Sequence, residues 1–310
     1  MLKHVMEACE LLDDASINGP QVADLLTSRG LERIDVKTMR GEGGSTDFIK
    51  TVIPGVEGKK SGGNAPTLGI IGRLGGIGAR PERVGMVSDA DGAITVISCA
   101  LKLADMGIRG DRLNGDVIIA THICPDAPTQ PHEPVPFMKA PVTMPEMNEH
   151  EVDSEMDAIL SVDSTKGNRI INYRGIAITP TVKEGYILRI SEDLLDILAW
   201  TTGKPPRVTP ITTQDITPYG NGLFHMNSIM QPCTATNSPV VGVAVTTETA
   251  VPGCATGANH EVDIEEAGRF CLEVAKAFTE GNCRFYDEGE FKRVVELYGR
   301  MNVLQTLGGV

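Results

Sequence analysis

Three polar side chains, Asp89, His122 and Asp163, have the chemistry to bind a divalent metal ion. A hydrolytic zinc site needs about three protein ligands from His, Asp, Glu or Cys and an open position for water, whose pKa the ion lowers towards neutrality. Each of the three follows a segment with the sequence pattern of a β-strand, so the three side chains can lie close together at one edge of a sheet. We predict a zinc or manganese ion here, with Asp91 and Glu133 as catalytic residues. Other side chains could replace a ligand or act as the base: Cys124, Asp126, His132 and Glu133.

A purely structural role is open for each of these residues. The Ser-Asp pair at 88–89 could cap the following helix, with Asp91 in its first turn, where negative charge is favourable. The Asp-Ser-Thr sequence at 163–165 could form a turn that hydrogen-bonds its own backbone. His122 could be a buried histidine satisfied by a carbonyl, and His132, between two prolines, could be an exposed loop residue.

Two polar or glycine-rich stretches are candidates for substrate binding. The loop 72–78 (GRLGGIG) matches neither the dinucleotide pattern nor the Walker pattern, so its glycines would instead permit close backbone approach. Arg73 within it could hold a carboxylate through two parallel hydrogen bonds. A later stretch is dense in hydrogen-bonding side chains and could be a wall of the site or a solvated loop. Its members are Asp215, Tyr219, Asn221, His225 and Asn227.

Strand and helix signals alternate along the chain. Such alternation is typical of an α/β fold with a mainly parallel sheet and helices on both faces, where ligands bind beyond the carboxyl ends of the strands. The predicted helices are 1–14, 20–29, 191–202, 263–281 and 291–301, a strand, glycine loop and helix share 66–107, and buried strands lie in 115–128, before Asp163, and in 239–247.

Three stretches have less regular patterns. The charged segment after residue 30 is expected to be irregular. The segment 129–151, with many prolines, two histidines and several acids, is expected to be an ordered functional loop rather than a helix or a free linker. We expect one α/β domain over residues 1–310, with helices at 1–30 and a C-terminal extension at 285–310.

Composition narrows the function class. The chain has 310 residues, 41% hydrophobic, enough for a sizeable core, and a net charge of −13 that disfavours nucleic acid and anionic membranes as partners. No run of about 18 apolar residues is present, and acids come too early for a signal peptide, so a cytoplasmic location is expected. The seven cysteines are scattered without a CxxC pair, which indicates reduced thiols.

The order of segments between 64 and 278 resembles the catalytic domain of zinc aminopeptidases and, more distantly, aminoacylases and carboxypeptidases. The motifs that carry this resemblance are SDADG, ILSVDST, ITTQDITPYGN and VPGCATGANHEVDIEEAGRF. The resemblance implies a three-layer sandwich of the phosphorylase/hydrolase type, a divalent metal and a homo-oligomer. It also implies that Asp89 is a metal-bridging ligand and that Asp163 is a second metal aspartate.

Several ligand positions of those enzymes hold other residues in this chain. Arg73 and Gly75 stand where the first histidine and aspartate are expected, and 122–125 (HICP) replaces the glutamate pair. The closing histidine is expected about seven residues before Asp263, where Thr256 stands. Asp89 and Asp163 are kept, so the metal site is expected to be remodelled or lost.

The whole chain also resembles an uncharacterised prokaryotic family, the domain of unknown function 1177, through SDADGAI, THICPDAP, QPHEPVPFM, TTQDITPYGN and GANHEVD. That resemblance implies no reaction. Three functions stay open: a metal-dependent hydrolase of a small amide or peptide-like substrate, a non-catalytic ligand-binding or regulatory protein, and metal-free acid–base chemistry at Asp89, Asp163 and His122.

Overall fold

The computed structural model describes residues 1–14, 16–41, 43–73, 75–78, 85–127, 129–131, 137–138, 140–211 and 228–305. Within these ranges, no helix is long and apolar enough to span a membrane.

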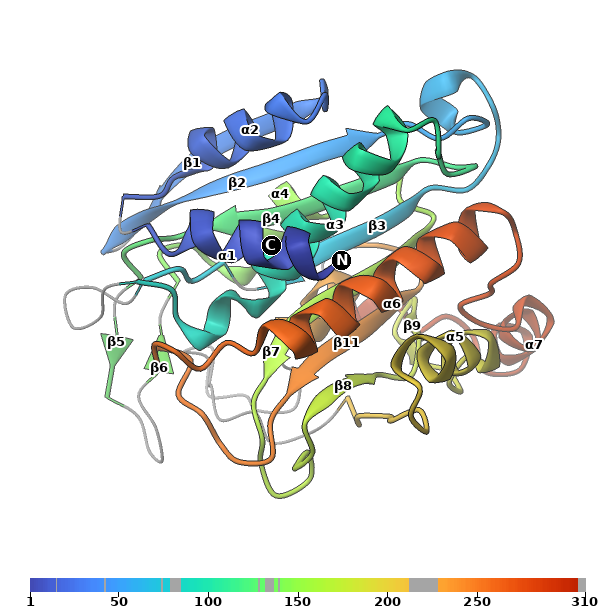
Figure 1. The fold of residues 1–310 in the computed structure, drawn as a ribbon. Coiled ribbons are helices and arrows are strands. Elements are labelled where there is room, and N and C mark those ends of the chain that lie inside the picture. The colour runs from blue at the N-terminus through green and yellow to red at the C-terminus, as the bar shows by residue number, and fades with distance from the viewer. Residues whose placement is uncertain are drawn as a thin grey trace.

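A mixed sheet of nine strands lies at the centre of the described part of the chain (Figure 1). Its order is β1-β2-β4-β3-β7-β11-β9-β10, and β8 pairs with β11. The strands of this sheet are β1 (Ile34–Gly41), β2 (Gly44–Ile53), β3 (Leu68–Arg73), β4 (Val117–Ile123), β7 (Ala158–Thr165), β8 (Gly175–Ile178), β9 (Val182–Lys183), β10 (Tyr186–Ile187) and β11 (Val240–Thr246). A separate antiparallel pair is formed by β5 (Thr129–Gln130) and β6 (Phe137–Met138).

The central strands β4, β3, β7 and β11 run parallel to one another. β3, β4 and β11 are buried along their whole length, as their continuous apolar sequences require when both faces of a sheet are covered. The outer strands pair antiparallel. We call the end of the sheet at which β3, β4, β7 and β11 finish the carboxyl edge.

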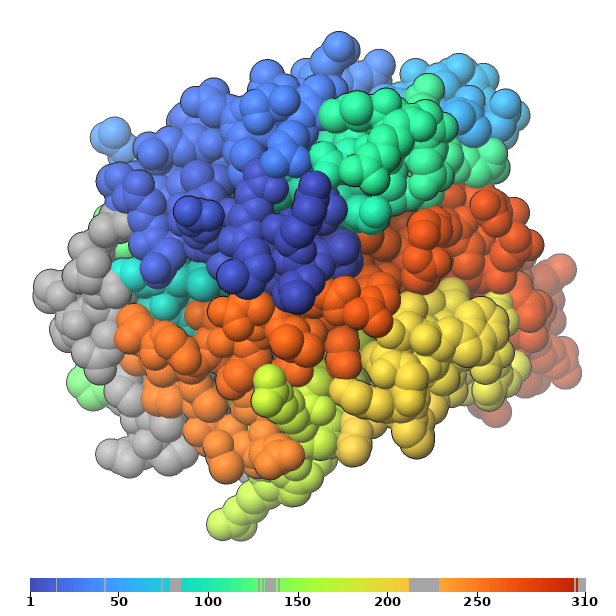
Figure 2. All heavy atoms as spheres, viewed as in Figure 1, coloured from blue at the N-terminus to red at the C-terminus, as the bar shows by residue number. Residues whose placement is uncertain are grey.

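Side chains from alternate positions of the central strands enter two different cores. One core joins Ile70, Leu160 and Val243 to the helices α1 (Leu2–Leu12), α3 (Asp91–Ile108) and α6 (Glu261–Thr279). Figure 2 shows these helices closing over that face of the sheet. The other core joins Ile71 and Ile159 to η3 (Ser228–Thr234), and α4 (Met144–Glu151) packs beside it against β2 and β4. The predicted α/β fold with both faces covered is therefore confirmed.

The remaining helices lie around these layers. They are α2 (Gly19–Ser28), α5 (Glu192–Thr202), α7 (Glu288–Tyr298), and the short η1 (Lys59–Ser61), η2 (Ser88–Ala90) and η4 (Asn302–Leu304). The helices predicted near 1–14, 20–29, 191–202, 263–281 and 291–301 are confirmed as α1, α2, α5, α6 and α7, with ends shifted by a few residues.

Two predictions of irregular structure were wrong. The charged segment after residue 30 forms the antiparallel hairpin β1–β2, and β1 escaped recognition because most of its residues are exposed or only half-buried at the edge of the sheet. The stretch 129–151 ends in α4, whose start is fixed by a capping box between Thr143 and Glu146. Pro145 lies in the first turn of α4, where proline removes no helical hydrogen bond.

All seven cysteines are free and buried. Burial raises the pKa of Cys9, Cys124, Cys233 and Cys283 to about 12. Since the thiolate is the reactive form, these four thiols should react slowly at pH 8 in the native chain and rapidly after unfolding in urea. Alkylation followed by peptide mass spectrometry checks this, and rapid native labelling of these four would contradict it.

Candidate site at the carboxyl edge

The structure brings three aspartates to the carboxyl edge. Asp163 is buried in β7, in register with Arg73 of β3 and Ala244 of β11. Asp89 lies half-buried in η2, and Asp91 is the fully buried first residue of α3. Asp89 and Asp163 therefore reach the same end of the sheet, as expected for side chains that follow parallel strands.

Two glycines allow α3 to start directly against the end of β3. A Cβ atom added at Gly92 would lie 2.1 Å from the carbonyl oxygen of Arg73. One added at Gly72 would lie 2.5 Å from the carbonyl oxygen of Gly92. Side chains at either position would push the helix away from the strand. The glycine in SDADG therefore sets the depth at which the two preceding aspartates lie.

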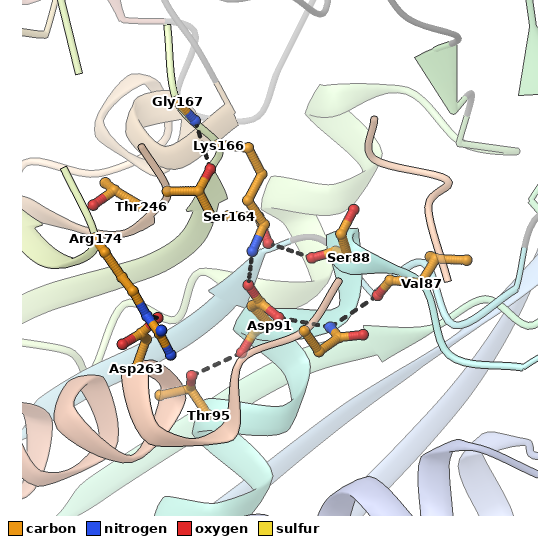
Figure 3. Close-up of polar contacts among 12 residues, drawn as sticks. Val87, Ser88, Asp91, Thr95, Ser164, Lys166, Gly167, Arg174, Thr246 and Asp263 are labelled. Atoms are coloured by element: carbon orange, nitrogen blue, oxygen red, sulfur yellow. Dashed lines mark hydrogen bonds and ion pairs between the residues drawn. The ribbon is translucent and has the colours of Figure 1, made fainter. Parts of the chain in front are cut away.

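An ion pair lies at the start of α3 (Figure 3). Lys166, which follows β7, points its ammonium at Oδ2 of Asp91, and its side chain is only 4% exposed. The side-chain amide of Asn259 donates to Oδ1 of the same carboxylate at 2.6 Å and to the carbonyl of Val87 at 3.0 Å. Both oxygens of Asp91 therefore have protein partners.

Hydrogen bonds fix the η2 segment that carries Asp89. The Ser164 hydroxyl donates to the Ser88 carbonyl at 2.7 Å, which ties β7 to η2 (Figure 3). The Ser88 amide donates to Ala255 at 2.9 Å, and the Asp89 amide donates to Gly253 at 3.1 Å. The backbone position of Asp89 is thus set by hydrogen bonds to two segments that are distant in the sequence, β7 and residues 253–255.

The Asp89 carboxylate lies between two glycines. A Cβ atom added at Gly76 would lie 3.5 Å from its Oδ2, and one added at Gly253 would lie 3.8 Å from its carboxylate group. These are ordinary contact distances, but a Cβ atom at Gly76 would also lie 1.9 Å from Cε of Met138, so room beside the carboxylate is left on the Gly253 side. Since Asp89 is half-buried, solvent reaches this part of the edge.

A second buried network joins α4 to the sheet. Glu151 is fully buried, and its carboxylate contacts Nε of Arg73 at 2.6 Å and Nδ1 of His122 at 2.7 Å. The Arg73 guanidinium also donates to Asn148 at 2.5 Å. Burial acts to raise the pKa of Glu151, but the charge of Arg73 and the hydrogen bond to His122 outweigh it and hold that pKa below its usual value.

The surroundings of His122 define its tautomer. Its Nε2 accepts a hydrogen bond from the Gly75 amide at 3.0 Å, so this nitrogen carries no proton. The proton is then on Nδ1, where it is donated to Glu151. A metal ion could bind His122 only after one of these hydrogen bonds broke. The arrangement instead matches the structural alternative considered for His122, with a carboxylate in place of a carbonyl.

Arg73, expected as a substrate anchor, is 0% exposed. Its guanidinium is bound to Glu151 and Asn148 in the interior, so in this structure it is a structural cation and not an exposed anchor. The reason is α4, which the sequence prediction treated as a loop. Asp91, expected as a catalytic residue, is likewise buried and engaged with Lys166 and Asn259.

Sequence reasoning missed four side chains of these two networks. Glu151 and Asn148 lay in a segment predicted as a loop. Lys166 comes directly after the ILSVDST motif and Asn259 lies within GANHEVD, but neither side chain was assigned a role. One signal was the position of Lys166 directly after the strand with Asp163, since the carboxyl ends of parallel strands line the site. The other was the position of Asn259 within a family motif. The other predicted site residues lie outside the described part of the chain: Glu133, Asp215, Tyr219, Asn221, His225 and Asn227, together with His132.

The described residues do not by themselves fit a metal ion. Among them, no group of three or more His, Cys, Asp or Glu side chains is arranged to hold one. Two of the three predicted ligands, Asp89 and Asp163, share the edge, but the third, His122, has both ring nitrogens occupied. Cys124, a possible replacement, is kept as a thiol by its raised pKa of about 12.

The family model described as "Protein of unknown function (DUF1177)" matches residues 37–308. The chain belongs to this family. The family resemblance noted from the sequence motifs is thereby confirmed. No curated protein matches the sequence.

Solved structures of a maturation enzyme and of two aminopeptidases share the fold of this DUF1177 chain. The bottromycin maturation enzyme BotP in complex with Mn matches with a TM-score of 0.50 and 12% identity over 89% of this chain and 70% of that chain. The Legionella pneumophila aminopeptidase LapA matches with a TM-score of 0.51 and 10% identity over 91% of this chain and 72% of that chain. The Caenorhabditis elegans leucine aminopeptidase LAP1 matches with a TM-score of 0.51 and 11% identity over 86% of this chain and 65% of that chain. The scaffold is therefore aminopeptidase-like, and at these identities the likeness is one of fold alone.

Proposed function

We propose that this chain is a hydrolase of a small amide or peptide-like compound, with its site at the carboxyl edge around Asp89, Asp163 and Lys166. The observation that carries the proposal is the placement of Asp89. Asp89 is half-buried beside Gly253, on a backbone fixed by two distant segments, at the edge where α/β sheets bind ligands. The aminopeptidase-like scaffold supports the same reaction class.

In this proposal the described side chains have separate roles. Asp89, which solvent reaches, acts as the general base that takes a proton from water. Lys166 supplies positive charge that favours an oxygen on which negative charge develops. Asp91 positions Lys166 through the buried ion pair. A divalent ion such as zinc or manganese on Asp89 and Asp163 would need further ligands, and no step of the proposed reaction depends on it.

Hydrolysis of a panel of dipeptides, N-acyl amino acids and lactams by untagged protein tests this function. We expect turnover by the natural chain and a loss of about 10²-fold or more in Asp89→Asn, because a general base typically contributes 10²–10⁴-fold. Asp111→Asn is the matched control, since Asp111 is exposed beyond the far end of α3 and should leave the rate unchanged. Full activity in Asp89→Asn, with the fold verified by circular dichroism, would contradict the proposal.

A second candidate is a non-catalytic binding protein on the same scaffold. It is favoured by the closed networks at Arg73, His122 and Asp91, in which groups at or beside the expected metal-ligand positions are bonded to one another. A compound from the same panel would then raise the melting temperature without being cleaved, because a ligand at 100 times its Kd stabilises the native state by about 2.7 kcal/mol. Chromatographic recovery of the intact compound separates this outcome from hydrolysis.

A further inference from the structure

Lys166 is a cation fixed inside the candidate site. Its side chain is 4% exposed, that of Asp91 is 0% exposed, and the ammonium contacts the carboxylate directly. Both oxygens of Asp91 are satisfied, one by Lys166 and the other by Asn259 at 2.6 Å. Burying a carboxylate is costly unless a positive charge and hydrogen bonds compensate it, and this arrangement supplies both.

The ammonium joins the two segments on which metal aspartates were expected. Asp91 follows Asp89 by two positions at the start of α3, and Lys166 follows Asp163 by three positions at the end of β7. The hydrogen bond from Ser164 to the Ser88 carbonyl holds these segments together beside the ion pair (Figure 3). Among the described residues, Lys166 therefore places a positive charge at the junction between the two segments.

An ammonium and a metal ion exclude each other at such a junction. A protonated lysine has three N–H donors and no lone pair, so it cannot be a ligand, and it repels a divalent cation bound between the same two segments. The described residues around it also hold no group of three metal-binding side chains. We propose that the Lys166 ammonium takes the place of a divalent cation at the carboxyl edge, so that the folded site is complete without a metal ion.

This inference rests on the site location given under the proposed function, but it does not depend on turnover. Its first test is the natural chain itself. After purification without a tag and dialysis against EDTA, elemental analysis should find no stoichiometric metal, and added Mn²⁺ or Zn²⁺ should shift the melting temperature by less than about 1 °C. A stoichiometric ion that resists dialysis, or a melting temperature that falls in EDTA, would overturn the inference.

The second test removes the ammonium. Lys166→Met keeps an unbranched chain of similar length but no charge. In EDTA this variant should melt at least about 5 °C below the natural chain, and Mn²⁺ should recover most of the difference by entering the vacated cation position. Lys204→Met is the matched control, because Lys204 pairs with Glu266 at 2.7 Å but is 56% exposed, and it should show neither change. Destabilisation of Lys166→Met with no recovery in Mn²⁺ would also overturn the inference.

A double variant covers the case in which Lys166→Met does not fold. Asp91→Asn with Lys166→Met removes both charges of the pair, so it should fold and be insensitive to Mn²⁺. Stabilisation of the double variant by Mn²⁺ equal to that of the single variant would show that the metal acts elsewhere. All these readouts are melting temperatures and metal contents, so a lack of turnover in the hydrolase assay does not contradict this inference. Equally, a bound metal ion found in these tests would not contradict the proposed hydrolase activity.

Discussion

Replacing Glu151 with glutamine is expected to lower the free energy of unfolding by about 3–5 kcal/mol. Glutamine has nearly the size of glutamate, so the change removes charge and leaves no cavity. The guanidinium of Arg73 would then be buried without a counter-charge, which is the costly consequence of breaking a buried ion pair. Urea denaturation at neutral pH measures the loss.

An exposed pair provides the control for this variant. Glu155 contacts Lys60 at 2.5 Å, but its side chain is 43% exposed. Glu155→Gln should therefore change the free energy of unfolding by less than about 1 kcal/mol. If the two variants lost equal stability, burial of the Glu151 network would not be the source of its strength.

Glu151 also makes the free energy of unfolding depend on pH in the acidic range. Because its pKa is held below the usual value of 4.5 in the folded chain, its contribution is complete above that value and is lost as the pH falls through the lower folded pKa. The stability difference between the natural chain and Glu151→Gln should therefore shrink from roughly pH 5 downwards. A difference that grew in acid would contradict the direction of this pKa shift.

Replacing Gly92 with alanine is expected to destabilise the chain by at least about 1–3 kcal/mol. The new Cβ would lie 2.1 Å from the carbonyl oxygen and 2.6 Å from the amide nitrogen of Arg73, and neither backbone atom can rotate away. Helix α3 would have to move off β3, and Asp89 and Asp91 would move with it. Thermal unfolding measures the loss of stability, and any hydrolysis found in the panel assay should fall as well.

The same helix contains the matched control. Gly107 lies near the end of α3, and a Cβ added there would meet nothing within 4 Å. Gly107→Ala should therefore stabilise the chain by about 0.5–1 kcal/mol, because alanine loses less backbone freedom than glycine in a helix. The two substitutions are chemically identical and are expected to have opposite signs. Stabilisation by both would show that the contact between α3 and β3 can relax.

Local patterns in the sequence determined the layers of this protein. The continuous apolar runs at 117–123 and 240–246 are the buried strands β4 and β11, because a strand covered on both faces has no polar side to display. The amphipathic run after residue 261 is α6 for the equivalent reason in a helix. The same logic placed Asp89 and Asp163 at one edge, since parallel strands end on the same side of a sheet.

Pairings between distant residues were decided only by the tertiary structure. Lys166 and Asp91 are 75 positions apart, and so are Arg73 and Asn148. Hydrophobic periodicity reports which face of an element is buried, but it carries no information on which polar side chains meet inside. Those contacts depend on strand register, on the glycine contact that sets the depth of α3, and on α4, a helix in a proline-rich segment that was predicted to be a loop. The sequence by itself therefore placed Asp89 and Asp163 at one edge of the sheet, and only the packing of the elements decided that His122 and Arg73 are held by Glu151 and that Asp91 is held by a lysine.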